Sequence, residues 1–225
     1  MVVAIHQPNF LPWMGYFYKM AKCDVFIFLD NVQFSKNSFQ NRVKIKTPQG
    51  AQWLTVPVHF RFGQLTYEVQ IDNQTNWREK HLKTFEMNYK RAPFFDEVYS
   101  LLKDIYLKAK WTSLVDFNIE LIMKICGYLD IKPQTMKASS LDVEGKATEL
   151  LIGLVKKVGG KIYLSGTGGM KYQDEERFKE EGIELVYSDF VHPIYPQLWS
   201  DFIEGLSIID LLFNMGSESK KFFLK

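Results

Sequence analysis

The chain opens with a short apolar segment, Val2 to Ile5, which ends in His6 and is followed by a loop containing two prolines. A helical pattern of apolar residues covers 15–22, and a second continuous apolar run follows at 25–29. Continuous runs of this length are typical of strands buried on both faces, as in parallel sheets covered by helices. The order strand, loop, helix, strand therefore predicts an α/β fold with a parallel sheet at its core.

The rest of the chain is consistent with a single domain, 1–225, that adds two parts to this sheet. Alternating apolar and polar residues predict a small insertion of antiparallel or edge strands at 42–72, including a strand over 65–72. Apolar residues at three- and four-residue spacing predict a helical segment at 77–130. A second series of strand, glycine-rich loop, helix and strand follows at 161–190, which returns the chain to the parallel sheet.

Composition excludes several classes of function. The net charge is only +2, so no general attraction to nucleic acid or anionic membranes is expected. Cys23 and Cys126 lie far apart in apolar surroundings, and no histidine pair has metal-ligand spacing, so we expect neither a disulfide nor a metal site. The N-terminus lacks signal-peptide features, and no apolar stretch approaches the roughly 20 residues of a membrane helix. We expect a cytoplasmic protein that acts on small molecules.

The loop after the first strand carries polar side chains at the edge where parallel sheets bind their ligands. His6 is followed by Gln7 and Asn9, which offer hydrogen-bond donors and acceptors, and by Trp13, which offers a stacking surface. Gly15 allows the backbone to approach another group closely. The alternative is a core histidine bonded to a carbonyl, with the prolines shaping an ordinary turn.

The loop after the second strand, 30–42, should lie beside the first loop at the same edge of the sheet. Arg42 could hold a phosphate or carboxylate with two parallel hydrogen bonds. Asp30 could hold a metal, a ribose or an amine. The segment also supplies three amide side chains, those of Gln33, Gln40 and Asn41. The alternative is a solvated loop with an ordinary surface ion pair.

A third loop combines glycines with hydroxyl groups between a predicted strand and a predicted helix. Its residues are Ser165, Gly166, Thr167, Gly168 and Gly169. Backbone amides in such a strand-to-helix loop can bind a phosphate. The spacing matches neither the dinucleotide-binding fingerprint nor the P-loop, however. The alternative is a flexible turn that precedes a helix.

Several segments, spread over nearly the whole chain, together resemble the WbqC-like family. They are "IHQPNFLPWMGYFYKM", "FLDNVQFSKNSFQNR", "WLTVPV", "LSGTGGMKYQDEERFKEEGI", and "HPIYPQ" followed by "LSIIDLLFNMG". The resemblance implies a setting among bacterial and archaeal surface-polysaccharide genes, in the modification of sugars for O-antigen or a related glycan. The family motifs fall on His6, Gln7, Pro8, Trp13, Gly15, Asp30, Gln33, Gln40, Asn41, Arg42, Ser165, Gly166, Gly168, Gly169, Tyr172, Tyr195, Gln197 and Asp210.

The opening segment also resembles the nucleotidylyltransferase-like α/β fold, a Rossmann-like fold in which a histidine loop binds nucleotide phosphates. The second histidine of its H-x-G-H pattern is absent, because Asn9 stands at that position. This departure argues against direct nucleotidyl transfer and leaves nucleotide binding open.

These observations lead to the hypothesis of a transferase that acylates or aminoacylates a nucleotide-linked amino sugar, with ATP as the candidate activator of the acyl group. In this hypothesis His6 is the general base or binds a phosphate, Asp30 orients an amine or ribose, and Arg42 acts with the glycine-rich loop on phosphate. The expected substrate-binding residues are Gln7, Asn9, Trp13, Gln33, Gln40, Asn41, Tyr172, Tyr195 and Gln197. The alternative is a non-catalytic nucleotide- or sugar-binding protein of the same pathway.

Overall fold

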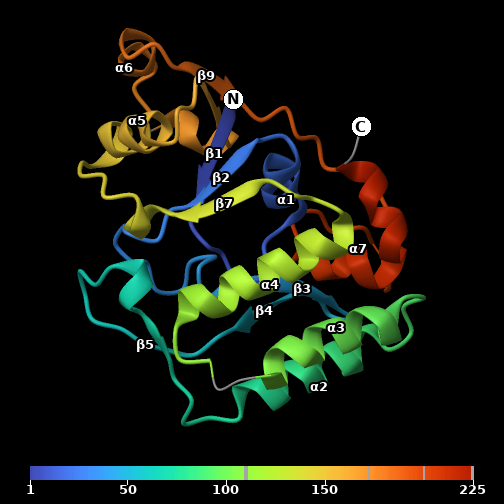
Figure 1. The fold of residues 1–225 in the computed structure, drawn as a ribbon. Coiled ribbons are helices and arrows are strands. Elements are labelled where there is room, and N and C mark those ends of the chain that lie inside the picture. Colours follow the sequence, from blue (N-terminus) through green and yellow to red (C-terminus); the bar gives the residue numbers. More distant parts are fainter. Residues whose placement is uncertain (109–110, 172, 200, 224–225) are drawn as a thin grey trace.

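The computed structural model describes residues 1–108, 111–171, 173–199 and 201–223, and these form a parallel sheet of five strands in the order β7-β2-β1-β8-β9 (Figure 1). The strands are β1 (Val2–His6), β2 (Val25–Phe28), β7 (Gln134–Lys137), β8 (Ile162–Ser165) and β9 (Glu184–Tyr187). β1 pairs in parallel with β2 on one side and with β8 on the other. The prediction of an α/β fold with a parallel core is confirmed.

The order of the strands reverses at β1. Counted along the chain, β1, β2, β7, β8 and β9 are strands one to five of this sheet, so their spatial order is 3-2-1-4-5, that of doubly wound folds. The helices α1 (Met14–Ala21) and α4 (Leu114–Leu129) pack on one face, and α5 (Ala147–Lys157) and α6 (Glu175–Glu180) pack on the other (Figure 1).

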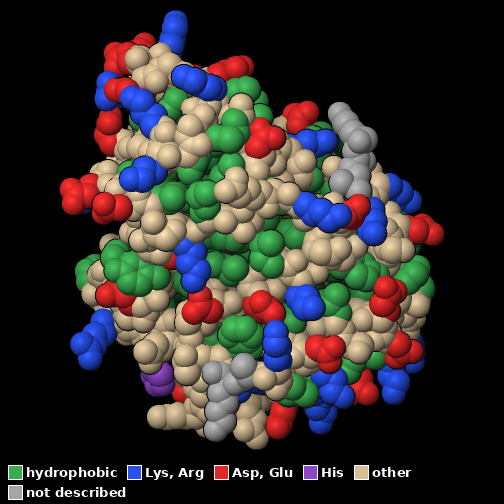
Figure 2. Space-filling model, in the orientation of Figure 1, with side chains coloured by type: hydrophobic (Ala, Val, Ile, Leu, Met, Phe, Trp, Pro, Cys, Tyr) green, Lys and Arg blue, Asp and Glu red, His purple; other side chains and the backbone are tan. Residues whose placement is uncertain are grey.

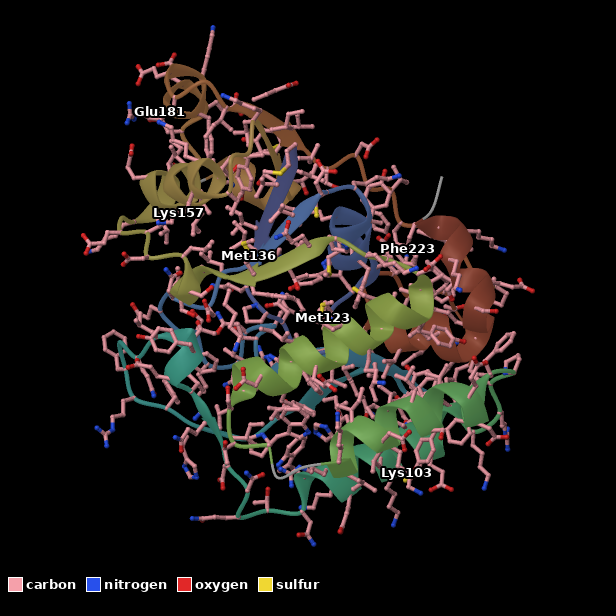
Figure 3. All side chains as sticks on the ribbon, in the orientation of Figure 1. Lys103, Met123, Met136, Lys157, Glu181 and Phe223 are labelled. Carbon is pink, nitrogen blue, oxygen red and sulfur yellow. The ribbon has the colours of Figure 1, made fainter. Side chains whose placement is uncertain are left out.

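Side chains that point alternately to the two faces of the central strands explain how one sheet packs against a helical layer on each face. Successive side chains of a strand point to opposite faces. In β1 and β2, one set of side chains joins the hydrophobic cluster of α1 and α4, and the other set joins that of α5 and α6. The first set is Ala4, Phe26 and Phe28, and the second is Val3, Ile5, Val25 and Ile27. Figure 3 shows Met136 of β7 between Met123 of α4 and the Lys157 end of α5.

The predicted β insertion contains a hairpin of β3 (Arg42–Thr47) and β4 (Gly50–Thr55), followed by a short pair of β5 (Val58–His59) and β6 (Gln70–Ile71). The continuous strand expected over 65–72 is wrong. Its first half is a 3-10 turn, η1 (Thr66–Glu68), because the Glu68 carboxylate accepts a hydrogen bond of 2.8 Å from the Leu65 backbone N–H.

The middle of the chain is helical, as its periodicity indicates. It contains α2 (Trp77–Tyr89), α3 (Phe95–Lys108) and α4. The sequence did not lead us to expect α7 (Ile208–Met215), whose eight residues are all buried and so show no solvent-exposed face. Short 3-10 turns complete the fold at η2 (Ala138–Ser140), η3 (Thr167–Lys171) and η4 (Gly216–Phe222).

The surface agrees with the low net charge of the sequence, and the helices agree with its lack of a long apolar stretch. In Figure 2, acidic and basic side chains are interspersed over the visible face and form no large patch of one sign. In the part of the chain that the structure describes, every helix is too short or too polar to cross a membrane.

Two glycines test the packing of the helical layer in opposite directions. Gly216 has φ 53° and ψ −137°, and an added Cβ would lie 2.2 Å from a ring carbon of Phe94. We therefore expect Gly216→Ala to lower the free energy of unfolding by about 1–3 kcal/mol. Gly127 lies in α4 with open space around it, so Gly127→Ala should raise that free energy by about 0.5–1 kcal/mol. Urea unfolding measures both, and equal effects would contradict this packing.

Candidate functional site

A small cavity lies at the carboxyl ends of β1 and β8, where the strand order reverses. This is the position at which doubly wound folds bind ligands. Its volume is about 70 Å³. The lining residues come from the first loop, from α1 and from the segments after β8 and β9, and they are His6, Trp13, Gly15, Tyr16, Lys19, Gly166, Thr167, Ser188 and Phe190. Of the residues expected from the sequence to act together, the structure brings His6, Trp13, Gly166 and Thr167 into one cavity.

His6 is the last residue of β1 and is held in one orientation. Its Nδ1 lies 3.1 Å from the carbonyl oxygen of Gln7, which also accepts a hydrogen bond from the Tyr16 hydroxyl at 3.1 Å. An Nδ1–H that donates to this carbonyl leaves Nε2 as a hydrogen-bond acceptor. Burial, assisted by the nearby charge of Lys19, lowers the pKa of His6 to about 3. The side chain is therefore neutral near pH 7.

A second histidine shows by contrast what a purely structural role looks like. His81 of α2 is buried, and both of its ring nitrogens have partners, the Tyr106 hydroxyl at 3.1 Å and the Thr55 carbonyl at 3.0 Å. The Nε2 atom of His6 has no such partner among the described residues, and His6 lines a cavity. His6 thus combines a bond to a backbone carbonyl with one nitrogen left for a ligand.

Lys19 is a site residue that the sequence reasoning missed. Its side chain is buried, and its ammonium group donates a hydrogen bond of 3.2 Å to the carbonyl of Ile5 in β1. Burial lowers the pKa of Lys19 to about 8. The signal was present in "MGYFYKMA", because a helix with apolar residues over most of its circumference leaves little room for a lysine to face solvent.

The glycine-rich loop contributes to the opposite wall of the cavity. Ser165 ends β8 and is buried, and its carbonyl accepts a hydrogen bond of 2.8 Å from the Ser188 backbone N–H after β9. Gly166 and Thr167 reach the cavity, whereas Gly169 packs against Ser165 and Gln173, where an added Cβ would lie 2.6 Å from the Ser165 hydroxyl. The loop continues into η3 before α6 begins.

Asp30 lies outside the cavity lining and ties β2 to the segment after β7. It is completely buried, and its carboxylate accepts hydrogen bonds from the backbone N–H of Ser139 at 2.8 Å and from the Ser139 hydroxyl at 2.6 Å. These two contacts fix the start of η2. They occupy both carboxylate oxygens, so Asp30 acts on the fold at this edge of the sheet.

The amide side chains of the second loop also make contacts within the protein. Asn41 is buried and donates to the Val56 carbonyl at 3.1 Å, and Gln40 is buried against Thr66. The guanidinium group of Arg42 stacks on the ring of Trp53, with 4.1 Å between its carbon and the ring centroid. The cavity lining, taken over the described residues, includes neither Asn41 nor Arg42.

The remaining predicted residues occupy three kinds of position. Tyr195 and Gln197 belong to a buried polar network, in which Tyr195 donates to Asp210 at 2.9 Å and Gln197 accepts from Lys46 at 2.9 Å.

Asn9 is buried in the first loop, Gln7 is half-buried, and Gln33 is exposed in a bridge to Leu65. Gly168 is exposed in η3, and Tyr172 lies outside the described residues.

Within the described ranges, no group of three or more histidine, cysteine, aspartate or glutamate side chains could hold a metal ion. Cys23 and Cys126 are both free thiols. The cavity itself is lined by the imidazole of His6, the ammonium group of Lys19, and hydroxyl or backbone groups. These groups suit an anionic or hydrogen-bonding organic ligand.

Comparison with known proteins supplies the family. The model of the WbqC-like protein family matches residues 7–222. The chain belongs to this family. An uncharacterized protein of Mycobacterium tuberculosis is 39% identical to this WbqC-like protein over 220 residues, which cover 96% of this chain and 95% of the relative. No solved structure matches. The nucleotidylyltransferase-like character of the sheet therefore stays a prediction.

Asp30 provides a test of which polar residues serve the fold. Removing the buried carboxylate takes away both protein acceptors of Ser139 and leaves a gap at a buried position, so Asp30→Ala should lower the free energy of unfolding by about 1–3 kcal/mol. Ser139→Ala removes the hydroxyl and keeps the backbone donor paired, and should cost less. Chemical denaturation measures both variants. Unchanged stability in Asp30→Ala would indicate instead that this carboxylate serves a ligand.

Proposed function

We propose that this WbqC-like protein is a cytoplasmic transferase of surface-polysaccharide biosynthesis that acylates or aminoacylates a nucleotide-linked amino sugar. Membership of the family suggests an association with polysaccharide gene clusters. The observation that carries the chemical part of the proposal is the pairing of a neutral histidine and a buried lysine in one cavity at the reversal point of the sheet.

Each side chain has a role in this proposal that follows from its surroundings. The buried ammonium group of Lys19 attracts the negative charge of an activated acyl group, such as an acyl phosphate made with ATP. Gly166 and Thr167 offer backbone and hydroxyl groups to the same phosphate. His6 Nε2 accepts a hydrogen bond from the amine of the acceptor sugar, and Trp13 offers a ring face for sugar or base.

The proposed step is an acyl transfer that needs only these groups and the two substrates. The amine nitrogen attacks the acyl carbon, so that a C–N bond forms and the C–O bond to the phosphate breaks. The phosphate leaves with the electron pair, and the amine proton passes to His6 Nε2 and then to solvent. Lys19 stabilises the negative charge that develops on the oxygens.

One observation favours the alternative of a non-catalytic nucleotide- or sugar-binding protein. With a pKa of about 3, His6 is a weak base, whereas a general base works best with a pKa near the operating pH. The two functions differ in product. A transferase converts an amino sugar to its amide when acyl donor and ATP are present, which mass spectrometry detects, and a binding protein leaves the sugar unchanged.

Replacing Lys19 and measuring the Kd of a ligand is the sharpest test of ligand binding. Thermal shift against ATP, nucleotide amino sugars and amino acids identifies a stabilising ligand, because a ligand at 100 times its Kd adds about 2.7 kcal/mol. For that ligand we expect Lys19→Met to raise the Kd about 10- to 100-fold, since a charge-assisted hydrogen bond is lost. Methionine suits the apolar site, so the fold should persist. The matched control is Lys103→Met, on the outer side of α3 (Figure 3), and an equal Kd in both variants would contradict the proposal.

Ligand binding should also change the titration of His6. A negative charge in the cavity favours the protonated imidazole, so the pKa of His6 should rise from about 3 when the ligand is bound. By linkage, the affinity for the ligand should increase as the pH falls from 7 toward 4.5. Imidazole ¹⁵N shifts with and without ligand measure this. His81, whose pKa burial lowers to about 4, is the internal control and should not respond.

A further inference from the structure

The cavity beside His6 is small compared with an ordinary ligand pocket. Its volume is about 70 Å³, whereas pockets for whole metabolites measure roughly 300–1,000 Å³. An apolar cavity of about 150 Å³ accommodates benzene, which has six non-hydrogen atoms. By this scale the cavity holds a group of about three or four non-hydrogen atoms, so the nucleotide and sugar must lie outside it.

Two aromatic side chains in contact with each other line one side of this cavity, which is partly open to solvent. The rings of Trp13 and Phe190 meet edge to face, with centroids 5.3 Å apart and an interplanar angle of 83°. Trp13 is 40% exposed and also lines the cavity, so its indole forms a wall with one side toward water. Phe190 packs in turn against Tyr18, whose hydroxyl donates to Asp189 at 2.9 Å.

Gly15 allows Trp13 to take this position. A Cβ added to Gly15 would lie 2.5 Å from two carbons of the Trp13 ring, closer than any real contact. The indole therefore lies across the first turn of α1, over the backbone of Gly15. Any larger residue at position 15 must push the ring away from α1 and so enlarge the opening of the cavity.

The charge inside the cavity indicates the kind of small group that fits. Lys19 brings an ammonium group, and no aspartate or glutamate belongs to the lining. In the part of the chain that the structure describes, Lys19 has no carboxylate within ion-pair distance. A small carboxylate fits the available volume and pairs its negative charge with this ammonium group. In the acyl group derived from it, the carbonyl oxygen accepts the same hydrogen bond.

We propose that the transferred group is a small acyl group of about three or four non-hydrogen atoms, and that Trp13 and Phe190, with Gly15 beneath the indole, set this limit. This inference rests on the proposed function and names its donor: an activated acetyl- or glycyl-sized carboxylic acid. A longer acyl chain meets the Trp13–Phe190 pair before its carbonyl carbon reaches His6 and Lys19.

The test uses the free carboxylates formate, acetate, propionate and butyrate as probes of the whole protein, with NMR chemical shifts as the readout. In the wild type we expect butyrate to bind at least about 10-fold more weakly than acetate, because one methylene too many beside the Trp13–Phe190 pair costs about a factor of ten or more. In Trp13→Ala the ratio of the Kd for butyrate to the Kd for acetate should fall to about one. Gly15→Ala, which displaces the same ring, should lower the ratio as well.

Trp53→Ala is the matched control, because Trp53 is similarly exposed (44%) and lies outside the cavity lining. It should keep the wild-type ratio. If Trp13→Ala does not fold, Trp13→Phe keeps an aromatic contact with a smaller ring and should give an intermediate ratio. Equal affinities for acetate and butyrate in the wild type, or an unchanged ratio in the folded Trp13 variant, would overturn the inference.

The result is separable from that of the proposed function. Transfer to an amino sugar that is lost in His6→Gln, without any size limit for carboxylates, would leave the transferase standing and remove the size inference alone. A size limit that depends on Trp13, in a protein that forms no amide product, would support the inference on the ligand and contradict the transferase.

Discussion

Every feature of the candidate site depends on the central position of β1 in the parallel sheet. β1 is hydrogen-bonded to β2 on one side and to β8 on the other, and the chain visits the β2 half of the sheet first. Because such crossovers are right-handed, the helices of the two halves lie on opposite faces. The loops that leave β1 and β8 therefore diverge, and a crevice opens between them. The order of connection, more than any single side chain, places His6 beside Gly166.

Parts of the first two loops at this edge are buried, and this explains their buried polar side chains, Asn9, Asp30, Gln40 and Asn41. Buried backbone groups need hydrogen-bond partners. Asn118 of α4 meets this need for two loops at once, since its amide donates to the carbonyls of Pro8 and Gln40, both at 2.8 Å. Gln197 does the same near the C-terminal segment, where it bonds to both backbone groups of Ile203. His6 and Lys19 differ, because their polar atoms face a cavity.

The sequence predicts the parallel sheet and the edge at which its loops meet, because both follow from local patterns. The runs at 2–5 and 25–29 are apolar at successive positions, which strands covered on both faces require, and parallel strands bring their loops to one edge. The roles of single side chains are not local. Asp30 bonds to Ser139, 109 positions away, and Gln197 bonds to Lys46, 151 positions away. Periodicity reports only the face of an element that is buried, so it could not distinguish these residues from ligand-binding ones.

Lys19 and His6 together give the cavity an unusual electrostatic character. A buried ammonium group that donates to a backbone carbonyl and has no carboxylate partner among the described residues is costly, and the Lys19 charge also opposes protonation of His6. An anion in the cavity offsets both effects, because it pairs with the ammonium group and raises the basicity of the imidazole. In the proposed transferase, His6 therefore becomes an effective base only in the complex that contains the negatively charged donor, which is also the complex in which the amine must lose its proton. The electrostatics of these two residues thus couple the basicity of the imidazole to the presence of the donor.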